Sequence, residues 1–291
     1  MIHPAHRQSI ALEPAQILSH AAGPDQQYIL TLHTPRCAEK ALPGSFVHLT
    51  VSDSVPMRRP LSIMRTHAEE GWIELLYKVV GKGTEELSRR KPGEYLSVLG
   101  PIGQPFILHE SRPAPLLIGG GVGIPPMIFI ADSIQKQHRQ HKPVVLLGSE
   151  SPFPLETRVS EKALTGIPDH VNHGLTLIEK MGFVSRLASL QSFEGCLQGY
   201  VTELAEFWLN SLDEAALNQV EIFSCGPHPM LEAVARLAEK YHLPCQVSLE
   251  EYMACAVGGC AGCVVEVKTD EGPAMKRVCV DGPVFEASQV F

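Results

Sequence analysis

Leu116-Leu-Ile-Gly-Gly-Gly-Val-Gly-Ile-Pro-Pro126 runs from an apolar segment through a glycine-rich loop to a pair of prolines. The apolar residues are typical of a buried strand. Proline suits the first turn of a helix, which we expect to continue to about Gln137. The surrounding stretch 113–131 is uncharged, but its prolines and glycines exclude a continuous membrane-spanning helix. The segment therefore predicts a strand, a tight turn and a helix.

Strands and helices alternate downstream of this segment. Apolar strands are expected at 144–147 and 220–223, and a helix is expected at 229–241. Such alternation is typical of a parallel α/β sheet, which we assign to residues 111–245. The connection 150–200 carries no comparable pattern.

Upstream, short strands are separated by turn signals. Three segments have strand character: 27–32, 44–51 and 72–80. Pro-Gly pairs at 43–44 and 92–93 mark turns between strands. The pattern predicts a small closed antiparallel β-barrel within residues 1–110. The final stretch, 246–291, is expected to form a compact domain that contains one hairpin.

The charge and composition of the chain argue against some classes of function. The chain has 291 residues, and its 24 Lys and Arg against 32 Asp and Glu give a net charge of −8. This charge, without a basic run, argues against general nucleic-acid binding. Residues 1–20 are broken by His, Pro, Arg and Glu and do not resemble a signal peptide, so we expect a cytoplasmic protein without a membrane span.

Four of the eight cysteines are clustered near the end of the chain. Cys255, Cys260 and Cys263 have C-x4-C-x2-C spacing, and Cys279 follows after fifteen residues. This is the plant-type [2Fe–2S] spacing. Interleaved glycines let the backbone approach a cluster and direct N–H groups at its sulfurs. A structural zinc site with four cysteine ligands is the alternative, although zinc ligands usually come as two separate C-x2-C pairs.

Two segments of the predicted barrel suit a flavin nucleotide. Arg59-Pro60-Leu61-Ser62 places a guanidinium that can grip a pyrophosphate, and the Ser62 hydroxyl can reach a flavin ring. Gly81-Lys-Gly83-Thr84 opens an apparent helix whose free N–H groups suit a phosphate. Taken singly, the first segment also reads as an exposed strand arginine and the second as an ordinary strand–turn–helix connection.

The glycine loop at 119–123 differs from the Rossmann fingerprint because Pro126 stands where the third glycine is required. It can still bring backbone amides to a phosphate at the end of a strand. Ser224-Cys225-Gly226-Pro227 ends another predicted strand in the same way. Glu150 follows a strand and is a candidate for an adenosine ribose or for a solvated loop carboxylate. His138 and His141 are expected to face solvent on a helix.

The flavin segments, the glycine loops and the cysteine motif, in this order along the chain, resemble the ferredoxin–NADP reductase superfamily. Its members pair an FAD-binding β-barrel with an NAD(P)-binding α/β domain. The barrel signature is Arg59-Pro-Leu-Ser62 with Gly83-Thr84, and the nucleotide signature is Gly119-Gly-Gly-Val-Gly with Cys225-Gly-Pro227. The tail, from Ser248 through Val278-Cys-Val-Asp-Gly-Pro-Val-Phe285, is similar to the electron-transfer subunits of type B dihydroorotate dehydrogenase.

The resemblance implies three domains: an FAD-binding barrel (1–110), an NAD-binding α/β domain (111–245) and a [2Fe–2S] domain (246–291). It implies particular residues for each cofactor. FAD is assigned to Arg59, Pro60, Leu61, Ser62, Leu76, Tyr77, Lys78, Gly83 and Thr84. NAD is assigned to Gly120, Gly121, Gly123, Cys225 and Gly226. The cluster is assigned to Cys255, Cys260, Cys263 and Cys279. Ser62, near flavin N5, and Cys225, on the nicotinamide side, are the expected catalytic residues.

The resemblance also implies a partner, the FMN-containing catalytic subunit, in a heterotetramer that serves pyrimidine biosynthesis. Electrons from dihydroorotate would pass through the cluster to FAD and then to NAD. Two alternatives stay open from the residues alone. One is the diaphorase subunit of a cytoplasmic hydrogenase or sulfite reductase, and the other is a zinc-stapled binding protein on a reductase scaffold.

Overall fold

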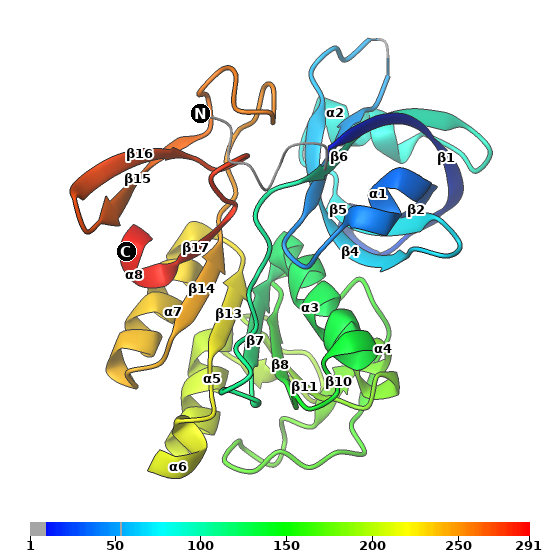
Figure 1. The fold of residues 1–291 in the computed structure, drawn as a ribbon. Helices are drawn as coiled ribbons and strands as arrows, with labels where there is room; N and C mark the ends of the chain where they lie inside the picture. Colours follow the sequence, from blue (N-terminus) through cyan, green and yellow to red (C-terminus); the bar gives the residue numbers. More distant parts are fainter. Residues whose placement is uncertain (1–9, 53) are drawn as a thin grey trace. The chain divides into compact units, whose positions relative to one another are not determined.

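The computed structural model describes residues 10–52 and 54–291 and divides them into two compact units. The first combines the residues up to Pro105 with Glu250–Val284, and the second combines Phe106–Leu249 with Phe285–Phe291. The first unit is therefore built from two separated stretches of chain. Figure 1 shows the elements of both units.

The first unit contains β1 (Ala11–Ala22), η2 (Pro24–Gln26), β2 (Gln27–His33), α1 (Pro35–Lys40), β3 (Phe46–Thr50), β4 (Arg59–His67), β5 (Trp72–Lys78), α2 (Lys82–Ser88), β6 (Tyr95–Ile102), β15 (Val264–Thr269) and β16 (Gly272–Arg277). Its first six strands form a closed barrel in the order β1-β2-β5-β4-β3-β6, with antiparallel neighbours. The predicted barrel is confirmed, and β15 pairs with β16 as the predicted hairpin.

Strand β1 was not predicted from the sequence. Three of its four inward positions carry alanine or a carboxylate and only Ile17 is large and apolar, so strand alternation is weak. Glu13 is buried and accepts hydrogen bonds from the Thr34 hydroxyl (2.6 Å) and the Cys37 backbone N–H (2.9 Å). This buried carboxylate thus satisfies donors at the start of α1.

The second unit contains β7 (Leu116–Gly120), η3 (Gly121–Gly123), α3 (Ile124–Gln137), β8 (Val144–Gly148), β9 (Thr157–Val159), β10 (His173–Leu175), α4 (Thr176–Lys180), β11 (Val184–Ser189), β12 (Leu197–Gln198), α5 (Val201–Asn210), α6 (Glu214–Leu217), β13 (Ile222–Cys225), α7 (His228–Lys240) and β14 (Cys245–Ser248). After the hairpin, β17 (Val284–Glu286) and α8 (Ala287–Val290) follow.

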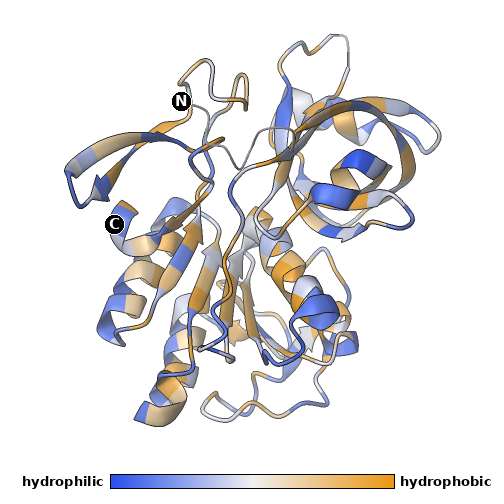
Figure 2. Ribbon diagram, viewed as in Figure 1, coloured by the Kyte–Doolittle hydropathy of each residue, from blue (hydrophilic) through white to orange (hydrophobic). Residues whose placement is uncertain are grey.

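The seven-stranded sheet has the order β12-β11-β8-β7-β13-β14-β17. Its central strands are buried because helices cover both faces, and Figure 2 shows that hydrophobic residues prevail along them. Helix α3 leads from β7 to β8, whereas α5 and α7 lead to β13 and β14 on the other side of β7. Right-handed crossovers therefore place α3 on one face and α5 with α7 on the other. The strand order reverses between β7 and β13.

The predicted environment of one histidine is wrong. Helix α3 ends at Gln137, and His141 lies in the following loop with its side chain fully buried. Its Nε2 is 3.2 Å from the backbone oxygen of His109, a contact between residues far apart in the chain. Among the described residues, no helix is long and apolar enough to cross a membrane.

Candidate functional site

The hairpin positions two of the four clustered cysteines. Cys263 directly precedes β15, and Cys279 follows β16 by two residues. Val264 pairs with Arg277 in the hairpin register, and the Val278 N–H donates to the Cys263 backbone oxygen at 2.9 Å. Both cysteines are buried. Strand pairing therefore brings the lone fourth cysteine to the third.

The other two cysteines lie on the preceding loop. Burial opposes ionisation of the Cys255 thiol, but hydrogen bonds from the backbone of Val257 and from Cys260 lower its pKa to about 7. Burial and a hydrogen bond with Cys263 raise the pKa of Cys279 to about 12. The sulfurs thus form two pairs, Cys255 with Cys260 and Cys263 with Cys279. Among the described residues, no three His, Cys, Asp or Glu side chains converge on a single metal ion.

The loop between Cys255 and Cys263 winds through three left-handed residues, Ala256, Gly258 and Ala261. This backbone directs N–H groups at sulfur, as the glycine pattern predicts: the Gly262 N–H lies 3.4 Å from the Cys260 Sγ. Arg277 secures the loop by donating to the Gly258 oxygen (3.2 Å) while it pairs with Asp281. Four cysteines in two pairs, with N–H groups aimed at sulfur, fit a two-iron cluster with two thiolates on each iron.

Strand β4 and the start of α2 bring two predicted flavin segments together. A Cβ added to Gly83 would stand 2.0 Å from the Arg59 Nε, so the guanidinium lies directly against this glycine. Arg59 also donates to the backbone oxygens of Met57 (2.8 Å) and Arg58 (3.1 Å). Around Gly81 nothing lies within 4 Å of the corresponding position. A held guanidinium beside an open, glycine-lined turn fits a pyrophosphate.

The remaining predicted flavin residues divide by orientation. Thr84 is buried, and its hydroxyl accepts from the Val80 N–H (3.0 Å) and donates to the Gly81 oxygen (3.0 Å), so this side chain shapes the turn. The Tyr77 ring is buried, and its hydroxyl lies 2.8 Å from the His20 Nε2. Leu76 is buried, whereas Pro60, Leu61, Ser62 and Lys78 are partly exposed. Two neighbours of Tyr77 were not predicted from the sequence: His20, and Tyr28, which stacks on the Tyr77 ring.

The predicted nucleotide residues lie at the point where the order of the sheet reverses. Cys225, at the end of β13, pairs with Gly119, near the end of β7. A Cβ on Gly123 would stand 2.1 Å from the Cys225 backbone oxygen, and those on Gly120 and Gly226 would meet the Met230 side chain. Most of these glycines therefore allow close packing of two loops. A crevice outside such strand ends is the usual ligand site of open α/β sheets.

Gly121 differs from its neighbours. Its φ is +55°, and nothing lies within 4 Å of its absent Cβ, so its backbone borders open space. Cys225 is buried at the end of its strand. Glu150 is exposed after β8, and its backbone oxygen accepts from the Gln191 amide at 2.6 Å. The role of Glu150 toward a ribose stays a prediction.

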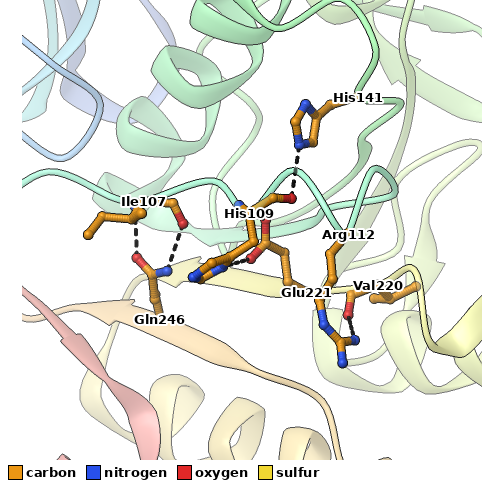
Figure 3. Close-up of polar contacts among 7 residues, drawn as sticks. All are labelled: Ile107, His109, Arg112, His141, Val220, Glu221 and Gln246. Carbon is orange, nitrogen blue, oxygen red and sulfur yellow. Dashed lines mark hydrogen bonds and ion pairs between the residues drawn. The ribbon is translucent and has the colours of Figure 1, made fainter.

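Figure 3 shows how residues 107–112, at the start of the second unit, are bound by other residues of the same unit. The Gln246 side chain exchanges two hydrogen bonds with the Ile107 backbone, at 2.9 and 2.8 Å. The buried Glu221 carboxylate accepts a hydrogen bond from the His109 backbone N–H (3.0 Å), and its second oxygen lies 2.6 Å from the Nδ1 of the His109 ring. Arg112 donates to the Val220 oxygen at 2.6 Å. None of these residues was singled out as a partner from the sequence, because each pair spans more than a hundred residues.

Two family models match the chain. The oxidoreductase FAD-binding domain matches residues 10–106, and the iron–sulfur cluster binding domain of dihydroorotate dehydrogenase B matches residues 250–291. The first contains the barrel with Arg59 and Gly83, and the second contains all four clustered cysteines.

Curated relatives cover nearly the whole chain. The electron transfer subunit of dihydroorotate dehydrogenase B (NAD(+)) from Caldanaerobacter subterraneus subsp. tengcongensis is 33% identical over 95% of this chain and 97% of that protein. The subunit of the same name from Bacillus caldolyticus is 35% identical over 97% of this chain and 99% of that protein.

Solved structures share the fold. An NADH-dependent reduced ferredoxin–NADP oxidoreductase, studied for flavin-based electron bifurcation, matches with a TM-score of 0.76 and 25% identity, covering 95% of this chain and 89% of that chain. The ferredoxin reductase of carbazole 1,9a-dioxygenase matches with a TM-score of 0.63 and 21% identity, over 81% of this chain and 67% of that chain.

Proposed function

Because this chain belongs to the family of electron transfer subunits of dihydroorotate dehydrogenase B, we propose that it passes electrons between a dihydroorotate-oxidising, FMN-containing catalytic subunit and NAD in pyrimidine biosynthesis. One observation carries the proposal. The paired cysteines and the barrel with Arg59 against Gly83 belong to the same compact unit. Flavin and cluster residues therefore share one folded body.

Each cofactor has its own residues in this proposal. Arg59 and the backbone at Gly83 and Thr84 bind the FAD pyrophosphate, and Ser62 lies near the reactive edge of the flavin. Cys255, Cys260, Cys263 and Cys279 hold the [2Fe–2S] cluster. Bound FAD supplies the exchange between two-electron hydride chemistry and one-electron transfer.

The α/β domain contributes the NAD site. Gly121 and its neighbours Gly120 and Gly123 present backbone amides to the dinucleotide phosphates, while Cys225 and Gly226 border the nicotinamide. An acidic Glu150 at the ribose favours NAD over its phosphorylated form. The expected division at 1–110, 111–245 and 246–291 assigns one cofactor to each domain.

A partner and a compartment complete the proposal. The complex is a heterotetramer with two copies of this chain and two catalytic subunits. All eight cysteines are free, which suits the reducing conditions of the cytoplasm.

The first experiment is a visible spectrum of anaerobically purified protein, with iron, acid-labile sulfide and zinc quantified. The proposal expects flavin bands and about two irons and two sulfides per chain, the content of one such cluster. One zinc and no flavin would contradict it and favour the zinc-stapled binding protein.

The second experiment adds the FMN-containing catalytic subunit. Dihydroorotate-dependent reduction of NAD should require both proteins. In size-exclusion chromatography, the mixed proteins should elute as one complex of two copies of this chain and two catalytic subunits. Protein that oxidises NADH with dyes but neither binds this subunit nor supports the reaction would favour the diaphorase alternative.

A further inference from the structure

His48 lies in the middle of β3, opposite Pro60 of the flavin-binding strand β4. Its neighbours along the strand, Val47 and Leu49, are fully buried, and strand alternation directs His48 to the other face of the barrel wall. His48 nevertheless has no exposed surface. Some other segment of the chain therefore covers this outward-facing side chain.

The covering segment is the one that leads to the cluster cysteines. The backbones of Met253 and Arg58 both lie close enough to the His48 ring to influence its pKa. Met253 stands two residues before Cys255. One ring thus lies close both to the residue that directly precedes the flavin strand β4 and to the segment that leads into the cluster motif.

The imidazole is electrically neutral in this position. Burial, followed by the nearby charge of Arg58 and then of Arg59, lowers the pKa of His48 to about 4. The Arg58 guanidinium is fixed because it donates to the His48 backbone oxygen and to the Ser97 oxygen, both at 2.9 Å. A neutral imidazole offers one N–H donor and one acceptor nitrogen.

Both of these groups are buried without a completed hydrogen bond. Neither His48 ring nitrogen has a hydrogen-bond partner of normal geometry among the described residues. Buried polar groups without partners are uncommon in folded proteins, so each one calls for an explanation. The Met253 backbone is close enough to complete one such hydrogen bond.

We propose that His48 is a positioning residue, whose imidazole holds the Met253 segment, and with it Cys255, against the flavin-binding strand. The inference rests on the proposed function, since it concerns electron transfer between flavin and cluster. Electron tunnelling weakens faster across a gap than through closely packed atoms. The cluster loop, with its left-handed residues, is also secured by Arg277, which donates to the Gly258 oxygen.

The test compares His48→Leu, His48→Asn and His48→Gln with wild type in the FAD- and cluster-loaded protein. Leucine removes both ring nitrogens, asparagine stays polar but is too short to reach Met253, and glutamine keeps both polarity and reach. His141→Leu is the matched control, because His141 is equally buried but belongs to the second unit.

Hydrogen–deuterium exchange over residues 250–257 is the readout that does not depend on activity. We expect at least tenfold faster exchange in His48→Leu and His48→Asn, and rates within about threefold of wild type in His48→Gln and His141→Leu. Unchanged exchange in both His48→Leu and His48→Asn overturns the proposal. The asparagine variant preserves the test if the leucine variant does not fold.

Stopped-flow reduction by NADH measures the reduction rate of the flavin and that of the cluster separately. His48→Leu and His48→Asn should reduce flavin at nearly the wild-type rate but reduce the cluster at least tenfold more slowly, with recovery in His48→Gln. Equal slowing of both steps would mean a general structural defect and would overturn the positioning role. If NADH reduces the flavin of the wild-type protein but not its cluster, the proposed function fails. The exchange measurement still tests the contact between His48 and Met253.

Discussion

At the scale of single residues, Gly83 matters because the Arg59 guanidinium occupies the place of its side chain. Gly83→Ala must push this flexible guanidinium aside, which weakens a charge-assisted contact to a phosphate. We expect about a 10- to 100-fold loss of FAD affinity, equivalent to roughly 1.5–3 kcal/mol. Iron content should stay at the wild-type level, because the cysteine pairs lie on other elements.

The measurement for Gly83→Ala is a fluorescence titration of the flavin-stripped protein with FAD. Ser88→Ala is the control on the same helix, because its hydroxyl is exposed and bonds only to Glu85 nearby. Wild-type affinity in Gly83→Ala would show that Arg59 does not hold the pyrophosphate.

His48 also predicts how stability depends on pH. Its pKa is about 4 in the folded protein and 6.5 by default, so below neutrality the unfolded chain binds a proton that the folded chain rejects. This contribution to stability is complete above about pH 6.5 and is lost as pH falls toward 4, up to a limit of about 3 kcal/mol. Between pH 7.5 and 5.5, the wild-type Tm should fall about 3–5 °C more than that of His48→Gln. Equal falls in a thermal melt would contradict a neutral buried imidazole.

At the scale of elements, the β15–β16 hairpin and the loop before it act together. Cys260 is the exposed member of its pair, so Cys260→Ser removes a thiolate without opening the core. We expect loss of the cluster and of electron delivery to the catalytic subunit. NADH oxidation by small dyes should continue, because the proposed flavin residues lie on β4 and α2. Loss of dye reduction in well-folded, flavin-loaded Cys260→Ser would mean that the order of the cofactors is different.

The loops after β7 and β13, where the strand order reverses, pack closely against each other. A methyl group on Gly123 would stand 2.1 Å from the Cys225 backbone oxygen, which cannot move as a flexible side chain can. Gly123→Ala should therefore separate β7 from β13 and raise the KM for NADH at least tenfold, roughly 1.4 kcal/mol of binding. Val122→Ala, an exposed position in the same loop, should change KM less than twofold. The assay is dye-linked NADH oxidation, and unchanged KM in Gly123→Ala would place the nucleotide elsewhere.

How well an element could be predicted depended on how local its signal was. The cysteine spacing, the strand from Leu116 and the helix to Gln137 are each encoded within a few residues. The structure has this strand and this helix, although β7 continues through Gly119 and Gly120, which were expected in the glycine loop. Strand β1 was missed because three of its four inward positions are alanine or Glu13, and only Ile17 is large and apolar. The surroundings of His48 and His141 are set by segments from distant parts of the chain, and no local pattern encodes them.

At the scale of the whole molecule, the chain passes from one unit to the other after Pro105, after Leu249 and after Val284. The first of these passages is fixed at Ile107 by Gln246. Gln246→Ala leaves both the backbone N–H and the backbone oxygen of Ile107 without their partner, at a cost of about 1–3 kcal/mol. We expect faster hydrogen–deuterium exchange at 106–110 and lower stability of the second unit, whereas Gln135→Ala on the exposed side of α3 should change neither. Unchanged exchange at 106–110 in Gln246→Ala would mean that other contacts hold this passage.

The divided first unit has a consequence for how the protein is made in the cell. A ribosome releases the barrel first and then synthesises all of residues 106–249 before the first cluster cysteine exists. At ordinary elongation rates this interval is on the order of ten seconds, long enough for a nascent barrel to fold alone. Flavin can be acquired during translation, but iron delivery must wait until the hairpin has left the exit tunnel. If the barrel binds flavin at this stage, a nascent chain stalled before Cys255 would be yellow and not brown.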